Sequence, residues 1–86
     1  MPRISEFFGV VISMYYDDHF PPHFHARYGE YRMSVTIDTL EVMEGFMPPR
    51  VRGLVVEWGA IHQLELELNW RLGRLGLPFN KIAPLE

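Results

Sequence analysis

The chain has 86 residues, a net charge of −3 and no cysteine. This length predicts one small domain over residues 1–86, and the negative charge disfavours a protein that coats nucleic acid through bulk charge. The lack of cysteine excludes disulfides and thiolate zinc sites. No apolar run approaches the roughly 20 residues of a membrane span, and the N-terminus lacks a signal-peptide pattern. We therefore expect a cytoplasmic protein with no membrane partner.

Four segments are rich in the β-branched, aromatic or alternating residues that are typical of strands. The expected strands are Phe7–Tyr16, His23–Tyr28, Tyr31–Asp38 and a shorter Glu41–Met47. Asp17–Pro22 is predicted to be a loop, because it combines two aspartates with two prolines. A further turn is expected at Thr39-Leu40, with Val42 near Ile37.

The second predicted strand alternates, so that one face is apolar and the other carries His23, His25 and Arg27. Gly29-Glu30 fits a two-residue hairpin loop of type II′, which wants glycine first and fixes the register. The expected pairs are Tyr28–Tyr31, Ala26–Met33 and Phe24–Val35 on the apolar face, and Arg27–Arg32, His25–Ser34 and His23–Thr36 on the polar face. This register places apolar residues opposite apolar ones and polar residues opposite polar ones, as a half-buried sheet requires.

One long helix is predicted from Pro49 to Leu75, because proline suits a first helical turn and Gly76 and Pro78 would end the helix. Apolar residues recur at spacings of three and four, which predicts a stripe that faces the sheet. They are Val51, Leu54, Val55, Trp58, Ile61, Leu64, Leu68, Leu72 and Leu75. Gly59 predicts a kink or a close contact with the sheet.

The expected fold class is α+β: an antiparallel β-meander of three to four strands packed by one long C-terminal helix, in two layers. The tail after the helix is too short for an element of its own. We expect Phe79, Ile82 and Leu85 to pack this tail onto the domain.

Three of the four histidines, His19, His23 and His25, fall within seven residues. The His-x-His spacing on a strand places both imidazoles on one face, which is a common beginning of a metal site. Candidates for a further ligand are Asp17, Asp18 and His62. A metal-dependent hydrolase is therefore one hypothesis.

The same face also supports chemistry without a metal. Imidazole suits acid–base work near neutral pH, and guanidinium binds phosphate. Arg27 directly opposite Arg32 is unfavourable unless an anion lies between them. A histidine pair beside an arginine pair is what metal-independent RNA cleavage requires, but the same face can bind a phosphate or an acidic partner without turnover. In the plainest interpretation the face is only solvated, and its histidines pair with aspartates or with a carboxylate of the helix.

The helix carries a second group of interest. Its members recur at steps of four, three and four and are Trp58, His62, Glu65 and Asn69. Glu65 can orient the imidazole of His62, which joins the site only if this row faces the histidine strand. The alternative is a polar flank of an amphipathic helix. Leu66 and Trp70 lie outside the core stripe, which predicts an exposed partner surface.

Several segments together resemble one family. They are Pro2–Ser5, Phe7–Gly9, His19–His25, Tyr28-Gly29, Pro48–Arg50, Glu57-Trp58, His62 and Asn69-Trp70. In these residues the chain resembles small bacterial proteins described as domain of unknown function 4160. The resemblance covers essentially the whole chain, and its Pro-Pro-His-Phe-His core is fairly specific. In that family an Asn often precedes the two prolines, where this chain has Phe20.

The resemblance implies a partner and a class of function. Genes of this family often lie beside one that encodes a domain of unknown function 2442, in an arrangement like a toxin–antitoxin operon with this protein as the toxin. The leading hypothesis is a toxin that inhibits gene expression and is neutralised by that protein antitoxin. It would cut or bind RNA, or block a protein of transcription or translation. The alternative is a non-catalytic regulatory binding module.

The toxin hypothesis assigns roles to residues and expects no cofactor. The predicted catalytic residues are His23, His25 and His62; the predicted anion or nucleic-acid contacts are Arg27, Arg32 and Arg50; and the predicted contacts to an antitoxin or a second copy are Leu66 and Trp70.

Overall fold

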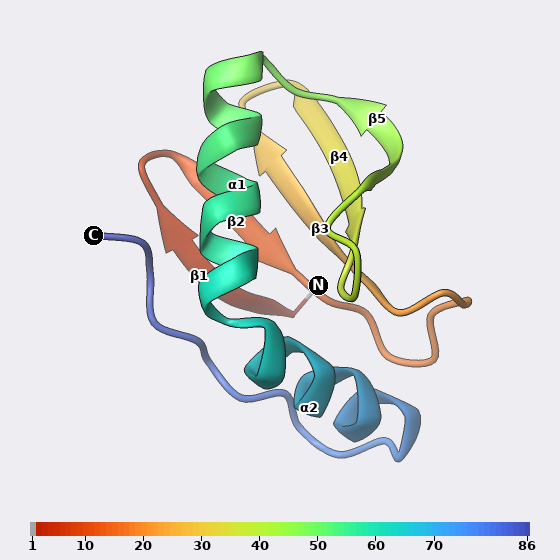
Figure 1. Ribbon diagram of the computed structural model, residues 1–86. Helices are drawn as coiled ribbons and strands as arrows, with labels where there is room; N and C mark the ends of the chain where they lie inside the picture. Colours follow the sequence, from red (N-terminus) through yellow and green to blue (C-terminus); the bar gives the residue numbers. More distant parts are fainter. Residues whose placement is uncertain (1) are drawn as a thin grey trace.

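The computed structural model describes residues 2–86, which form a five-stranded antiparallel sheet followed by two helices (Figure 1). The elements are β1 (Arg3–Phe7), β2 (Val10–Ser13), β3 (His23–Tyr28), β4 (Tyr31–Thr36), β5 (Val42–Phe46), α1 (Pro49–Ile61) and α2 (Gln63–Arg74). The strands lie in the sheet in chain order. The predicted α+β meander is confirmed, with five strands where three to four were expected and two helices where one was expected. Neither helix is long and apolar enough to cross a membrane.

The β3–β4 hairpin forms as the sequence predicts. All six expected pairs are present, from His23 opposite Thr36 to Tyr28 opposite Tyr31. Of the two loop residues, Gly29 alone has a positive φ, +59°, as a type II′ turn requires. Because a two-residue loop leaves no freedom in register, this hairpin fixes which side chains share the polar face.

The single first strand predicted over Phe7–Tyr16 is wrong, because the chain turns at Phe8 and Gly9. These two residues have φ of +47° and +81°, the pattern of a type I′ turn, and they separate β1 from β2. Residues 3–6, for which no strand was expected, therefore belong to the edge strand β1. A bulky aromatic at positive φ is uncommon, so the residue types carried no signal for this turn.

β5 follows the predicted turn at Thr39-Leu40, where Leu40 has a φ of +60°. Val42 pairs with Val35, two residues before Ile37, and the register shifts between Ser34 and Val35. The strand also requires a glycine. Gly45 has a φ of +86°, and a Cβ there would lie 2.2 Å from the Arg32 carbonyl oxygen.

The predicted long helix is interrupted at His62, which has φ −112° and ψ 25°. Figure 1 shows α2 running in a different direction from α1 beyond this residue. The predicted stripe therefore holds only as far as Trp58. Its exposed members beyond that point are Ile61, Leu64, Leu68 and Leu75. A straight-helix period cannot predict the buried face of a helix that changes direction.

α2 buries other positions instead, and these include the pair expected to be exposed. Leu66 is fully buried and Trp70 is 8% exposed. The expectation of an exposed partner surface at these two residues is wrong, because the break at His62 turns them toward the core. Gly76, with a φ of +72°, ends α2 as predicted, and the Leu77 N–H donates to the Leu72 carbonyl, 2.9 Å away.

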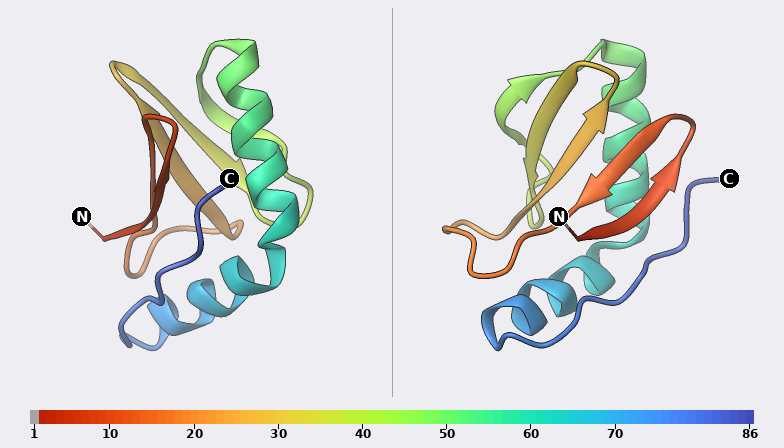
Figure 2. Two further views of the ribbon diagram at one scale, coloured as in Figure 1. Left: turned by 90° about the vertical axis from the view of Figure 1, so that its left-hand side faces the viewer. Right: turned by 180° about the vertical axis from the view of Figure 1, so that it is seen from behind.

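α1 lies across one face of the sheet, and the opposite face carries no helix (Figure 2). Between α1 and the sheet, the Trp58 ring packs against Phe7 and Phe24, with centroid distances of 5.5 and 5.7 Å. Gly59 makes the predicted close contact with the sheet, since a Cβ there would lie 3.4 Å from Phe24 Cζ in β3 and 2.9 Å from Leu40 Cδ2 in the turn before β5. The apolar faces of the strands are thereby used by the core, which leaves their polar faces free.

The C-terminal tail runs beside β1 (Figure 2), and its apolar residues pack on the core as expected. Ile82 is buried, and its N–H donates to the Ile4 carbonyl at 2.8 Å. The Trp58 indole N–H donates to the Ala83 carbonyl at 2.9 Å. The buried Asn69 amide bridges the Asn80 backbone through two hydrogen bonds of 2.9 and 2.8 Å. These contacts attach the tail to both helices and to the sheet.

Candidate functional site

The uncovered face of the sheet carries two neighbouring rows of side chains that cross the strands. Cross-strand partners share a face, so the register places them in order from β2 to β5. The first row is Ser13, His25, Ser34 and Glu44, and the second is Val11, Arg27, Arg32 and Phe46. A histidine and a carboxylate in one row thus lie beside an arginine pair in the next.

A hollow of about 190 Å³ lies over these rows. Its polar lining consists of Ser13, Tyr15, His25, Arg27, Arg32, Ser34 and Glu44. The Tyr15 ring meets the His25 ring edge-on, with their centroids 4.6 Å apart. Tyr15 and Glu44 were not singled out from the sequence. Glu44 could have been found by extending the predicted register from Ser34 to the next strand.

The two arginines carry charge that no carboxylate neutralises. Arg27 and Arg32 are direct cross-strand partners, and within residues 2–86 neither forms an ion pair with an acidic side chain. Like charges in this arrangement repel. Ser34, between His25 and Glu44, has a buried hydroxyl with no hydrogen-bond partner. The hollow therefore presents two arginines without acidic partners, which is the chemistry of an anion site, and the unsatisfied Ser34 hydroxyl is buried beneath it.

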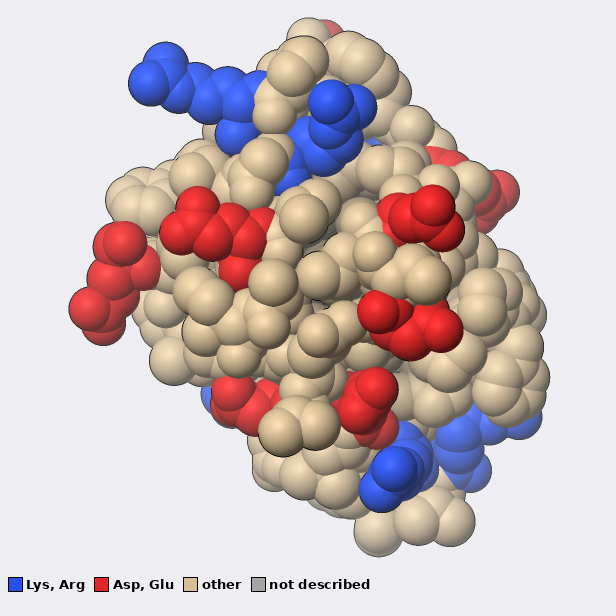
Figure 3. Space-filling view, in the orientation of Figure 1, with Lys and Arg blue, Asp and Glu red and all other residues tan. Residues whose placement is uncertain are grey.

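The opposite side of the molecule has a different charge pattern. Figure 3 shows the side that carries α1, with acidic side chains across its middle and basic ones gathered toward its upper and lower ends. That side offers no continuous basic surface. The predicted contact Arg50 lies in the first turn of α1 and does not line the hollow.

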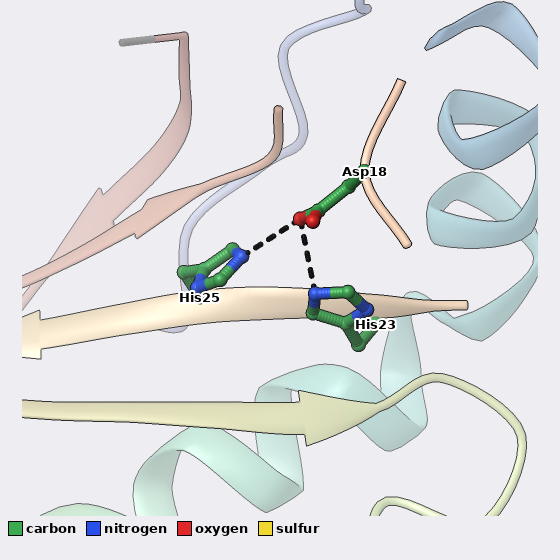
Figure 4. Close-up of side chains that lie close together, drawn as sticks. All are labelled: Asp18, His23 and His25. Carbon is green, nitrogen blue, oxygen red and sulfur yellow. Dashed lines mark hydrogen bonds and ion pairs between the residues drawn. The ribbon is translucent and has the colours of Figure 1, made fainter. Parts of the chain in front are cut away.

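A second cluster lies at the start of β3. Figure 4 shows the Asp18 carboxylate, from the loop before the strand, pointing at the rings of His23 and His25. Its Oδ2 lies 3.0 Å from the Nε2 atom of each histidine. The Phe20–Pro21 peptide bond, between Asp18 and β3, is cis. One carboxylate oxygen therefore links the two imidazoles of the His-x-His motif.

The two histidines differ in access. The His25 side chain is 33% exposed and lines the hollow, whereas the His23 side chain is 1% exposed. The His19 ring stacks on His23 at a centroid distance of 5.0 Å, and Trp70 lies 5.6 Å away. The expectation that His23 lies on a solvated face is wrong, because the loop and α2 cover it. His23 is connected to His25, and so to the hollow, through Asp18, which contacts both histidines.

Both ring nitrogens of His23 face oxygen atoms. Its Nδ1 lies 2.7 Å from the Pro21 carbonyl oxygen, and its Nε2 faces Asp18 Oδ2. Both oxygens only accept hydrogen bonds, and a neutral imidazole has one N–H. A neutral ring can therefore donate to only one of these two oxygens.

Asp18 is tuned by the same neighbours. Burial alone would raise the pKa of Asp18, but the hydrogen bond with His25, the bond from the His19 backbone N–H and the charges of His23 and His25 outweigh burial. Together they lower its pKa below the usual value, so the carboxylate form is favoured at neutral pH.

His62 lies apart from this cluster. Its Nδ1 hydrogen-bonds with Glu65 Oε1, as the spacing predicted, and its ring lies 5.4 Å from that of Trp58. It sits at the α1–α2 junction, on the helix side of the sheet, whereas His25 lines the open face. The structure thus does not bring His62 together with the strand histidines.

The potential metal ligands also differ from the predicted set. Within residues 2–86, the group of three such side chains that lies close together is Asp18, His23 and His25, with ligand atoms within 4.8 Å of one another. His19 Nε2 lies 3.9 Å from Asp18 Oδ1, and its ring is largely exposed. Of the predicted ligands, His23 and His25 therefore lie together with Asp18, which was expected as a further ligand, and His19 is not part of this group.

Fold and site define a small α+β domain with a histidine- and arginine-bearing open sheet face. A family model described as "Domain of unknown function (DUF4160)" matches residues 9–71. The chain therefore belongs to this family, and the resemblance seen in its sequence is confirmed. Comparison with curated proteins and with solved structures gives no significant match.

Proposed function

We propose that this protein is the toxin of a bacterial toxin–antitoxin module and that it acts in the cytoplasm by binding RNA in the hollow on the open sheet face. The observation that carries the proposal is the unpaired Arg27–Arg32 couple. Two arginines directly opposite each other on neighbouring strands can hold a phosphodiester through charge-assisted hydrogen bonds, and a bound phosphate would reduce their mutual repulsion. An antitoxin of the domain of unknown function 2442 type is its proposed partner.

The neighbouring row supplies further contacts for an RNA strand. Tyr15 and His25 offer aromatic faces at the rim of the hollow, and unstacked bases of single-stranded RNA stack on such rings. Glu44 would repel a phosphate placed at its end of the row, so it orients the strand toward the arginines.

The test is growth of bacteria in which this chain is induced without its antitoxin. We expect the wild type to stop growth and Arg27→Gln/Arg32→Gln to lose this effect. Arg50→Gln/Arg52→Gln is the matched control, because it removes the same two charges from exposed positions at the start of α1. It should stop growth like the wild type.

Each other outcome has a meaning. Equal arrest by all three chains would place toxicity on another surface. Loss of arrest in the control as well would show a dependence on net charge rather than on the hollow. If the wild type does not slow growth at all, the toxin proposal fails and the regulatory binding module takes its place.

A further inference from the structure

The Asp18, His23 and His25 cluster has the composition and spacing of a transition-metal site. Asp18 Oδ2 already lies 3.0 Å from both histidine Nε2 atoms, and all three ligand atoms lie within 4.8 Å of one another. Ligands of one ion with bonds of about 2.0–2.2 Å lie about 3.0–3.5 Å apart. Small rotations of the side chains in Figure 4 would place the three atoms around one ion.

The surroundings of His23 suit this task. Its Nδ1 lies 2.7 Å from the Pro21 carbonyl oxygen, and in the tautomer that donates Nδ1–H to this oxygen the Nε2 lone pair faces Asp18. Metal-binding histidines almost always donate their other ring N–H to a carbonyl or carboxylate in this way. An ion between Nε2 and Oδ2 would give both atoms a partner. The rings of His19 and Trp70 hold the imidazole in place.

We propose that Asp18, His23 and His25 bind one first-row divalent transition metal, such as Zn²⁺, through Oδ2 and the two Nε2 atoms. Two imidazoles and one carboxylate suit zinc and its neighbours better than Mg²⁺ or Ca²⁺, which prefer oxygen ligands. Three protein ligands leave at least one coordination position open. Since His25 lines the hollow, the open position lies at its edge.

The consequence for chemistry rests on the proposed RNA binding. A water on the metal would lose a proton to solvent and attack the phosphorus of a phosphodiester held by Arg27 and Arg32. A phosphorus–oxygen bond to the new oxygen forms and the bond to the leaving alcohol breaks. The alcohol takes up a proton, so one water is consumed for each bond cut. Metal binding itself does not depend on this step.

The experiment is calorimetric titration of the metal-stripped full chain with Zn²⁺ alone, with Co²⁺ absorption as a second readout. We expect one equivalent to bind. His25→Ala and Asp18→Asn should each weaken binding at least tenfold, since each removes a ligand. His62→Ala is the matched control, because it removes a histidine outside the cluster, and it should bind like the wild type. Thermal melts with Zn²⁺ should show a rise in Tm that His25→Ala loses.

Failure of this inference differs from failure of the proposed function. The metal site is overturned if the wild type takes up no stoichiometric Zn²⁺, or if uptake in His25→Ala and Asp18→Asn equals that of the wild type. An equal loss of binding in His62→Ala would overturn it as well. Growth arrest without metal uptake would leave the toxin proposal intact. Uptake without growth arrest would leave the metal site intact and remove the toxin.

Discussion

Asp18 is the residue on which the site depends most, and its neighbour shows why the sequence alone could not select it. Asp17 and Asp18 are chemically identical and adjacent. In the structure Asp17 adopts a φ of +58°, points to solvent and lies 3.8 Å from Arg74, while Asp18 turns inward to the histidines. The direction of the backbone turn decides which of the two aspartates faces the histidines, and no residue type in the loop predicts that direction.

Asp18→Asn tests the electrostatic role of this carboxylate. The folded chain lowers the pKa of Asp18, so the unfolded chain binds its proton more readily. The resulting stability is fully present above the unfolded pKa of about 4 and is lost as pH falls through the folded pKa. We expect the asparagine variant to lose about 1–3 kcal/mol of unfolding free energy at pH 7, because the histidines lose a charged partner.

The measurement is denaturant unfolding from pH 7 down to pH 2 in the absence of metal. The difference between wild type and Asp18→Asn should shrink on acidification through the region below about pH 4. Asp17→Asn is the matched control, since the same change falls on the exposed neighbour, and it should stay within about 0.5 kcal/mol of the wild type. A constant difference between Asp18→Asn and the wild type at every pH would contradict this account.

At the scale of elements, the sheet shows which patterns a sequence can resolve. The β3–β4 hairpin was predictable to the residue, because Gly29 marks a two-residue loop and every cross-strand pair then follows. The β1–β2 hairpin was not, because Phe8 occupies a turn position that normally carries Asn, Asp or Gly. The arginine pair and the row of His25 and Ser34 were therefore predictable from the sequence, whereas the position of Tyr15 beside His25 was not.

The helices show the complementary limit. The break at His62 has neither proline nor glycine at the interrupted residue, and the apolar spacing continues through it. Tertiary packing decides the direction of α2, since the buried Asn69 bonds to the tail and Gly73 lies close to Phe79. A local pattern cannot register such contacts, and this is why the stripe was assigned to the wrong face beyond Trp58.

Alanine substitutions at two leucines of α2 test which face of this helix is buried. Leu66 is fully buried and Leu64 is 82% exposed, although the apolar stripe predicted the opposite. We expect Leu66→Ala to cost about 2–5 kcal/mol of unfolding free energy through lost burial and a cavity. Leu64→Ala should change it by less than about 0.5 kcal/mol. Denaturant unfolding of both variants gives the answer, and similar losses would mean that α2 presents another face to the core.

At the scale of the whole molecule, the two faces of the sheet have separate tasks. One face packs against α1 around Trp58 and carries the core. The other carries the arginines, the partly exposed His25 and an unpaired buried hydroxyl, none of which the core uses. Side chains whose arrangement lowers the stability of a fold are retained where another interaction compensates for that loss. In this domain such side chains are gathered on the free face.

The arginine pair allows that division to be tested through stability and binding together. Arg32→Gln removes the repulsion with Arg27, so we expect unfolding free energy at low salt to rise by about 0.2–1 kcal/mol. Added salt should shrink the gain, because it screens the repulsion.

The same variant, Arg32→Gln, should bind labelled single-stranded RNA more weakly than the wild type does. Arg52→Gln, a matched loss of one exposed charge on α1, should leave RNA binding unchanged. A less stable Arg32→Gln would mean that this guanidinium supports the fold and that no repulsion between the two arginines calls for an anion.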